Sequence, residues 1–260
     1  MKVYIGFDDT DTIDADRGTG KVGRWFADEL PEGWTMWAVV RQQLLVHPDV
    51  PYTSHNSAAV CVLERTCGTG GTCASAGELD DIVARAAAHL RRHWMEGSDP
   101  GLCVAAAESA AMPALIAFGR RAAVEVVTQA EARLAAAGAH LSGHGGTEDG
   151  IIGAAAGVGL TAHGWNGRLI DYRAPLRDLP DPIAVRALEA LGISVLAVDR
   201  DAPVPAPRDV VRHDDWLRPR LWAGVPVLPV QRDGAGGWSA VGPRTIEAAP
   251  PAASSETPPG

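Results

Sequence analysis

The sequence predicts a mixed α/β (α+β) fold, built from two mixed α/β domains. Short apolar runs rich in β-branched residues alternate with longer stretches of helical periodicity, so strands and helices are interleaved along the chain. Clusters of glycine and proline separate these runs, as turns do. With 260 residues and 46% apolar content, the chain is also long enough to bury a substantial core.

In the first hundred residues, the pattern predicts three strands and two helices. The strands are expected at 3–7, 36–46 and 58–64, where apolar residues run together. A first helix is expected at 20–30. A second is expected at 78–94, because apolar residues recur there at helical spacing: Leu79, Ile82, Val83, Ala86 and Leu90.

After a Gly-Ser-Asp-Pro-Gly turn at 97–101, the second part of the chain mixes both kinds of element. Pro113 is typical of a helix start, and Thr128 with Glu131 has the spacing of a capping box for the next helix. Small residues at 151–159 predict a helix that permits close backbone contact. The remaining expectations are strands at 102–105, 168–172 and 194–198, helices at 113–127 and 183–191, and a hairpin or final strand at 217–230.

We expect a domain boundary near residue 100. The first domain would be an α/β unit over 1–100, and the second an α+β unit over 101–235 with a C-terminal extension. The end of the chain, 236–260, is expected to be a disordered tail because it is rich in proline, alanine and serine.

Composition narrows the class of partner. The formal net charge of -9 opposes nonspecific attraction to nucleic acid, so a small-molecule or nucleoside substrate is favoured over tRNA. No run of about 18 apolar residues and no signal sequence is found, which predicts no membrane span and a cytoplasmic location. The four cysteines form no CxxC pair, which favours free thiols over a zinc site. Nothing in the pattern indicates an oligomeric state.

Three carboxylates crowd the exit of the first apolar run, at Asp8, Asp9 and Asp11, and nothing basic follows until Arg17. Such groups repel one another unless a cation shares the site. Carboxylate oxygens suit Mg²⁺, which is commonly completed by substrate phosphates. These aspartates are therefore predicted to bind Mg²⁺ and the phosphates of ATP. The alternative is a solvated acidic turn that caps the next helix.

A glycine-rich segment follows, Gly18-Thr19-Gly20-Lys21, and it resembles the end of a phosphate loop. Val22 stands where a Walker motif has Ser or Thr. Small residues before a helix still admit phosphate to backbone amides, and Lys21 can neutralise its charge. An ordinary turn is the alternative. Arg41, in the middle of the strand at 36–46, is a further candidate for binding the nucleotide.

Two loops are candidates for binding the substrate. His55 and Asn56 lie between two predicted strands, where loops of α/β folds often gather ligands. Gly145 and Gly146 precede a helix and can admit an anion, and Asp149 can bind a cationic group or stabilise the helix start. Structural roles for the histidine and for the aspartate are the alternatives. Zinc binding by His140 and His144 is a weaker possibility, because the glycines beside His144 do not favour a helix.

Several segments, in the same order, resemble the archaeal agmatidine synthetases of isoleucine tRNA. The resemblance covers roughly residues 1–230 and implies a kinase-like first domain and a ferredoxin-like second domain, without the family's OB-fold and zinc ribbon. Enzymes of this family use ATP to phosphorylate a wobble-position cytidine and then join agmatine to it. The segments are Gly6-Phe7-Asp8-Asp9-Thr10-Asp11, the run from Arg41 to Asn56, Ser98-Asp99-Pro100-Gly101, Gly150-Ile151-Ile152-Gly153-Ala154-Ala155 and Gly167-Arg168-Leu169-Ile170-Asp171-Tyr172-Arg173.

By this resemblance, Asp8, Asp9 and Asp11 hold Mg²⁺ and the ATP phosphates. An insertion at 12–16 precedes Gly18, and Gly20-Lys21 stand where the family has Cys-Thr, so the match of Thr19 to the family's phosphorylatable threonine stays open. Three functions follow as hypotheses. The first is an ATP- and Mg²⁺-dependent phosphoryl-transfer or ligase-like enzyme, and the second is a nucleotide- or small-ligand-binding protein without chemistry. The third is a tRNA-modifying enzyme that needs a partner to bind tRNA.

Overall fold

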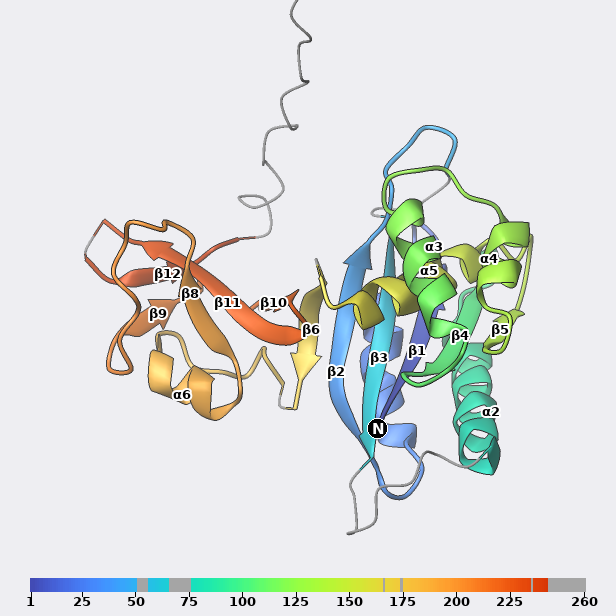
Figure 1. Cartoon of the computed structure of the whole chain (residues 1–260), viewed down its shortest axis with the longest axis horizontal. Coiled ribbons are helices and arrows are strands. Elements are labelled where there is room, and N and C mark those ends of the chain that lie inside the picture. The colour runs from blue at the N-terminus through green and yellow to red at the C-terminus, as the bar shows by residue number, and fades with distance from the viewer. Residues whose placement is uncertain (51–55, 66–75, 166, 174, 235, 243–260) are drawn as a thin grey trace, which may run out of the picture. The chain divides into compact units, whose positions relative to one another are not determined.

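The computed structural model describes residues 1–50, 56–65, 76–165, 167–173, 175–234 and 236–242, and it confirms the mixed α/β class. The chain forms two compact units (Figure 1). The first contains 1–176 and 219–227, and the second contains 177–218 and the chain from 228 onward. The expected division near residue 100 does not coincide with a boundary between these units, because the strand that follows residue 100 pairs with the first strand of the chain.

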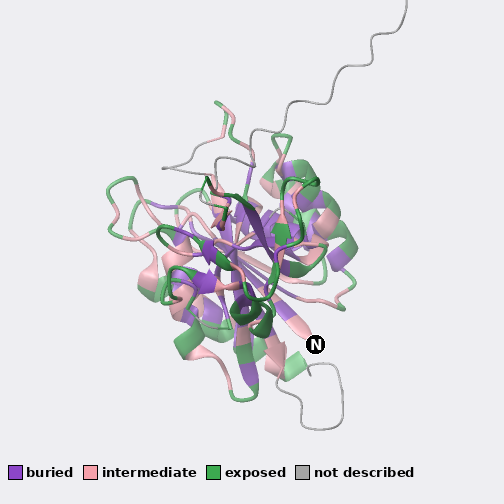
Figure 2. Ribbon diagram, turned by 90° about the vertical axis from the view of Figure 1, so that its left-hand side faces the viewer, coloured by how far each residue is buried: buried purple, intermediate pink, exposed green. Residues whose placement is uncertain are grey.

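The first unit is built around an antiparallel sheet with the order β5-β4-β1-β3-β2-β6-β10. The central strands are apolar and are buried along most of their length (Figure 2). Apolar residues occupy successive positions there because both faces of the sheet are covered. The strands are β1 (Lys2–Asp8), β2 (Trp34–Gln43), β3 (Ser57–Arg65), β4 (Gly101–Ala106), β5 (His140–Gly143), β6 (Arg168–Tyr172) and β10 (Arg220–Trp222).

Alternation along β3 shows which helix covers each face. Ala59 and Cys61 lie under Gly23 of α1 (Thr19–Trp25), whereas Ala58 and Val60 lie under Gly157 of α5 (Gly150–His163). Successive side chains of a strand point to opposite faces, so α1 and α5 pack on opposite sides of the sheet. The short 3-10 helix η1 (Phe26–Glu29) and α2 (Ala76–His93) share the face of α1, while α3 (Met112–Ala122) and α4 (Gln129–Ala135) pack against α5.

The second unit is a smaller assembly of short strands with one helix. Strand β11 (Val225–Arg232), whose first residues belong to the first unit, pairs antiparallel with β12 (Trp238–Ala240) and also pairs with β8 (Ser194–Ala197). Strand β9 (Val210–Arg212) lies between β12 and β7 (Ile183–Ala184), and α6 (Val185–Ala190) follows β7 directly. Trp238 is fully buried, and its Nε1 donates a hydrogen bond to Asp209 at 2.9 Å.

Most expected elements are present, with several differences, which include the unexpected short strands β7, β9 and β12. The expected helix at 20–30 is an α-helix followed by a 3-10 turn, and α3 ends at Ala122 instead of residue 127. Strand β5 was not anticipated. The capping box of Thr128 and Glu131 and the hairpin of β10 and β11 are confirmed.

Further expectations concern the cysteines, the tail and the membrane. Cys61 and Cys103 are free, as expected, and both are buried, whereas Cys67 and Cys73 lie outside the described residues. The expected disordered tail at 236–260 is wrong at its start, because Trp238–Ala240 form β12 and Trp238 is buried. Residues 243–260 lie outside the described residues. Over the part of the chain that the structure describes, no helix combines the length and apolar character that crossing a bilayer requires.

Candidate functional site

The acidic residues lie where the ends of three elements converge. Asp8 is the last residue of β1 and pairs in register with Gly101, the first residue of β4. Asp99 therefore lies beside the exit of β1. Helix α5 begins at the same place, because the amide of Gly150 donates a hydrogen bond of 2.9 Å to the carbonyl oxygen of Asp99. Residues far apart in sequence are thus brought to one edge of the sheet.

The carboxyl group of Asp8 lies against the first turn of α5. A Cβ at Gly153 would overlap its Oδ2 atom, so the helix reaches this distance from β1 only because residue 153 is glycine. The pKa of Asp8 is raised to about 8, mainly by burial and also by the negative charges of Asp9 and Asp11, while a hydrogen bond from the backbone of Asp9 opposes the rise. Without a cation, the fold holds this group largely protonated at neutral pH.

Asp9 shares this environment. Its φ of 51° turns the chain sharply after β1, a conformation that aspartate adopts more readily than most residues. Burial raises its pKa to about 6, and the negative charge of Asp99 is the next cause, followed by those of Asp11 and Asp149. The charges of three further carboxylates thus raise the pKa of Asp8 or Asp9: Asp11, Asp99 and Asp149.

Asp11 is held by hydroxyl groups. Thr19 Oγ1 donates to Asp11 Oδ1 at 3.1 Å, and Thr10 Oγ1 donates to Thr19 Oγ1 at 3.1 Å. Both threonines are buried. Burial raises the pKa of Asp11, and the hydrogen bonds from Thr19 oppose that rise. This chain of hydroxyls fixes the carboxylate relative to the start of α1.

No described Lys, Arg or His nitrogen lies within 4.0 Å of the carboxylates of Asp8, Asp9, Asp11, Asp99 or Asp149, although neutral donors contact some of them. Carboxylates brought together in a partly buried place without a basic partner are costly unless protons or cations neutralise them. The donor set is oxygen only, which fits Mg²⁺ better than a metal that prefers nitrogen or sulfur.

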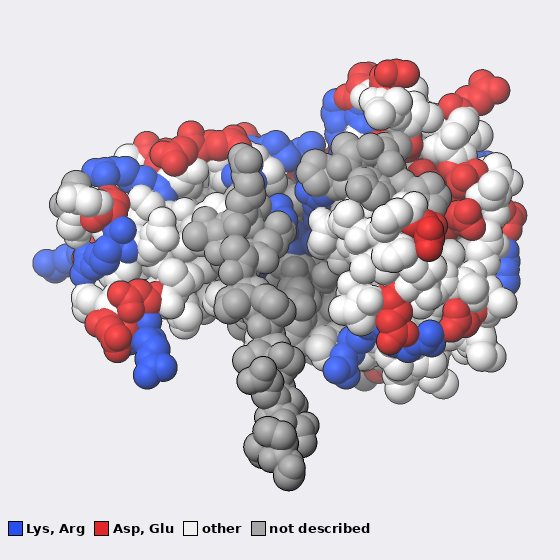
Figure 3. Space-filling model, turned by 90° about the horizontal axis from the view of Figure 1, so that it is seen from above, with Lys and Arg blue, Asp and Glu red and all other residues white. Residues whose placement is uncertain are grey.

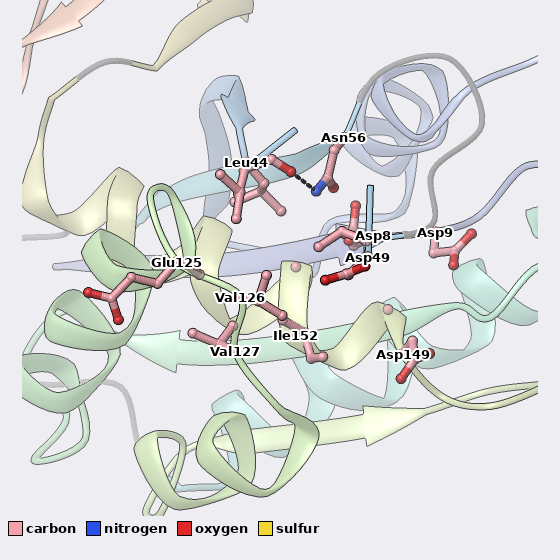
Figure 4. Close-up of a pocket in the computed structure, with 15 residues that line it drawn as sticks. Asp8, Asp9, Leu44, Asp49, Asn56, Glu125, Val126, Val127, Asp149 and Ile152 are labelled. Atoms are coloured by element: carbon pink, nitrogen blue, oxygen red, sulfur yellow. Dashed lines mark hydrogen bonds between the residues drawn. The ribbon is translucent and has the colours of Figure 1, made fainter. Parts of the chain in front are cut away.

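A cavity of about 200 Å³ opens beside this cluster. In Figure 4, Asp8, Asp9 and Asp149 lie toward one end, and Glu125 lies toward the other. Apolar side chains line the wall between them, so the cavity has an apolar middle and acidic groups toward both ends. The apolar lining residues are Leu44, Leu45, Val50, Ala122, Val126, Val127 and Ile152.

The structure separates Asp11 from that cavity. Together with Gly18, Asp11 lines a second, open hollow of about 240 Å³. Gly18 precedes α1 as its N-cap residue, and Gly20 packs near Ile170. The ammonium of Lys21 lies 5.2 Å from the centre of the Trp25 ring. Arg41 donates a hydrogen bond of 2.8 Å to Ser57 Oγ and is not among the described residues that line either space.

Only some residues of the two expected substrate loops line the cavity. Asn56 lines the cavity and donates a hydrogen bond of 2.6 Å to the carbonyl of Leu45, whereas His55 lies outside the described residues (Figure 4). Asp149 lines the cavity and accepts a hydrogen bond of 2.7 Å from Gln129 Nε2. Gly145 packs on Trp94, and Gly146 approaches the Asp99 carboxylate so closely that a Cβ would overlap it. The pair therefore shapes the loop around Asp99.

No sequence pattern indicated that Asp99, Asp49 or Glu125 belongs to the site. Asp99 belongs to the Ser98-Asp99-Pro100-Gly101 segment, and the register of β4 against β1 carries it to Asp9. The amide and hydroxyl of Thr147 donate to its two oxygens at 2.7 and 2.9 Å. The sequence signal that could have identified Asp99 is its position, as an acidic residue just before the strand that pairs with β1. Asp49 and Glu125 stand on loops, and no pattern indicated that they line a cavity.

The histidine pair His140 and His144 is bridged by a serine. Ser142 Oγ lies 2.9 Å from His140 Nε2 and 2.8 Å from His144 Nε2. Burial lowers the pKa of both imidazoles. These hydrogen bonds give the pair a structural role in β5.

No protein-family model and no curated protein matches the chain. Solved structures do match. The complex of TiaS with its isoleucine tRNA and ATP is 23% identical, with a TM-score of 0.50 over 71% of this chain and 42% of that chain. Apo TiaS, a tRNA agmatidine synthetase, is also 23% identical, with a TM-score of 0.48 over 70% and 42%. A tRNA fluorescent labeling enzyme is 24% identical, with a TM-score of 0.47 over 61% and 36%.

The chain thus spans less than half the length of the solved structures that it matches. The likeness shows the fold, and it confirms the structural resemblance that the ordered sequence motifs indicated.

Proposed function

We propose that the protein is an ATP- and Mg²⁺-dependent phosphoryl-transfer or ligase-like enzyme. The observation that carries the proposal is the acidic cluster at the exit of β1, which has no basic partner among the described residues. Burial and neighbouring negative charges raise the pKa of Asp8 to about 8 and that of Asp9 to about 6, so ionised carboxylates are disfavoured there when no cation is present. A likeness in fold to a protein solved with ATP supports the same proposal.

In this proposal, Asp8 and Asp9 hold the metal together with the nucleotide phosphates. Asp11 is a further carboxylate ligand, which approaches from the side of α1. When bound, Mg²⁺ neutralises the charge that develops on the phosphates during transfer. Thr19 orients Asp11 through its hydroxyl. Gly18, Gly20 and Lys21 are the candidates for contacting phosphate, and this role requires the Lys21 side chain to leave the Trp25 ring. Catalysis then arises from positioning and charge neutralisation.

We further propose that the acceptor is an elongated organic cation, such as an aliphatic diamine or an aminoalkyl guanidine. The cavity beside the cluster supports this class, because acidic groups stand toward both ends of an apolar wall. Methylene groups fit such a wall, and a cationic end group fits Glu125 or Asp149. The amine would attack an activated substrate near Asp8 and Asp9.

The activated substrate of the proposal is a nucleoside or a small molecule, with tRNA as the alternative that the solved complex suggests. On the face shown in Figure 3, acidic and basic side chains of the described residues are interspersed, and they form no broad basic surface there. Since phosphate backbones are held mainly by Lys and Arg, tRNA binding would need a partner protein or further contacts.

The decisive experiment measures ATP consumption by the purified protein with and without Mg²⁺, in a screen of amines and nucleosides, with products identified by ³¹P NMR. Asp9→Ala should abolish Mg²⁺-dependent turnover, whereas Asp14→Asn, an exposed aspartate of the same loop, should keep it. Wild-type turnover by Asp9→Ala would refute the proposal.

The alternative function is binding without chemistry. Thermal-shift measurements with ATP, agmatine and Mg²⁺ distinguish it when they are run beside the product assay. Stabilisation by Mg²⁺ and ATP without any product would favour the binding protein.

A further inference from the structure

A second group of potential metal ligands lies at the C-terminal end of α2. His89 and His93 are one helical turn apart and face Glu29 of η1. One ligand atom from each of the three residues lies within 4.8 Å of the other two. Two histidines at i and i+4 on one helix face, joined by a carboxylate, are a common ligand set for Zn²⁺.

Two hydrogen bonds hold the ring of His89 in the orientation that a metal ligand requires. The side chain is fully buried, and its Nε2 lies 2.9 Å from the carbonyl oxygen of Val22. A carbonyl oxygen only accepts, so Nε2 carries a proton and donates it. Metal-bound histidines typically donate their second nitrogen to a backbone carbonyl in this way. The other nitrogen, Nδ1, points to Glu29 Oε1 at 2.7 Å.

Aromatic rings keep water away from this nitrogen and fix the two imidazoles. Phe26 packs edge-on against His89 with ring centres 5.3 Å apart, and Trp25 lies 5.2 Å from the ring of His93. The two imidazole rings are 4.5 Å apart. His93 and Glu29 are only partly buried, so an ion can enter from their side.

We propose that Glu29, His89 and His93 bind one transition-metal ion of the Zn²⁺ class. Nitrogen ligands separate this site from the oxygen-only cluster at Asp8 and Asp9, which suits Mg²⁺. The ion would tie η1 to α2 and so brace the segment that begins at Thr19.

Binding has two local requirements. Any proton on His89 Nδ1 is released to solvent when the nitrogen takes the metal. Arg92 contacts Glu29 Oε2 and competes with the ion for that carboxylate. Its side chain is 55% exposed, so the guanidinium can turn toward water while Oε1 binds the metal.

The test uses the full chain after treatment with a chelator, in excess Mg²⁺ so that the acidic cluster is saturated with its own ion. Zn²⁺ is titrated and bound metal is counted by elemental analysis after dialysis. Co²⁺ then replaces Zn²⁺, and its visible absorption reports nitrogen ligands. We expect one ion per chain and a higher melting temperature.

His93→Ala should weaken Zn²⁺ binding by at least about 100-fold, because losing even an outer partner of a metal ligand typically costs about 10–100-fold. Glu29→Gln should weaken it as well. His144→Ala removes a histidine bonded to Ser142 elsewhere in the same unit and should leave the affinity and stoichiometry of Zn²⁺ binding unchanged. Wild-type affinity and stoichiometry in His93→Ala would overturn the proposal, and so would the absence of binding at micromolar Zn²⁺. Neither result depends on ATP turnover.

Discussion

The Asp8 carboxyl group and Gly153 are in such close contact that no Cβ fits between them. This contact joins the end of β1 to the first turn of α5, and it makes the position of a proposed metal ligand depend on a residue without a side chain. Gly6, earlier on β1, contacts the backbone of Ala154 in the same way. The helix therefore packs against the strand along backbone atoms, and the acidic group has little freedom to move.

Gly153→Ala should destabilise the protein, by about 1–3 kcal/mol, because the added methyl group forces Asp8 or α5 to shift. Gly77→Ala is the matched control. Gly77 lies near the start of α2 with open space around it, and alanine is the better helix former, so its stability should stay equal or rise by up to about 1 kcal/mol. Urea denaturation measures both. Equal stability of the Gly153 variant and the wild type would show that the contact is loose.

The raised pKa values of Asp8, about 8, and Asp9, about 6, predict how the metal-free protein responds to pH. An unfolded aspartate has a pKa of about 3.9, so between about pH 4 and 8 the folded state binds protons that the unfolded chain has released. The stability from these two groups is complete below about pH 4 and is lost as the pH rises to about 8.

Asp8→Asn removes most of this dependence. Relative to the wild type, the variant should therefore gain stability between pH 5 and pH 8 in the presence of a chelator, and its melting temperature at pH 8 should be higher by several degrees. Asp14→Asn, at an exposed position, should follow the wild type. Denaturation at three pH values tests this, and Mg²⁺ should stabilise the wild type at pH 8 but not Asp8→Asn. A parallel pH dependence in the two proteins would contradict the burial of Asp8.

Local patterns were sufficient to predict β1, its acidic exit and most helices. The run Val3 to Phe7 is strongly apolar, and the acidic residues that follow it are adjacent in sequence. The capping box of Thr128 and Glu131 is also local, because both hydrogen bonds join residues within one turn. Such features need no knowledge of the tertiary structure.

The remaining features depend on contacts between distant segments. Asp99 reaches Asp9 only through the register of β4 on β1, which no single segment specifies. Strand β5 is short and lies at the edge of the sheet, so it carries no apolar alternation. Helix α3 was expected to continue through Val126 and Val127, but these residues line the cavity instead. A local apolar period cannot distinguish a helix from a cavity wall.

Asp99→Asn should change both the pKa of Asp9 and the affinity for Mg²⁺. It removes a negative charge that raises the pKa of Asp9, so that pKa should fall. It also removes attraction for a cation, so Mg²⁺ affinity should fall by about tenfold or more. The pH dependence of stability in a chelator reports the first effect, and calorimetric titration with Mg²⁺ reports the second. Asp14→Asn controls for the loss of one charge. Unchanged Mg²⁺ affinity in Asp99→Asn would place the ion away from Asp99.

Thr19→Val tests whether the hydroxyl chain positions Asp11. Thr19 is 7% exposed, and its hydroxyl links Thr10 to the Asp11 carboxylate. Valine keeps the shape but leaves a partly buried carboxylate without this donor, which should cost about 1.5–3 kcal/mol and raise the pKa of Asp11 further. Thr19→Ser keeps the hydroxyl and should retain most of the stability.

Thr35→Val is the control for Thr19→Val, because Thr35 is an exposed threonine on β2 and its substitution should change stability by no more than about 0.5 kcal/mol. Urea denaturation of the three variants beside the wild type separates the hydroxyl from the methyl group. If Thr19→Val and Thr19→Ser lose the same stability, the hydrogen bond to Asp11 contributes nothing, and Asp11 is held by packing alone.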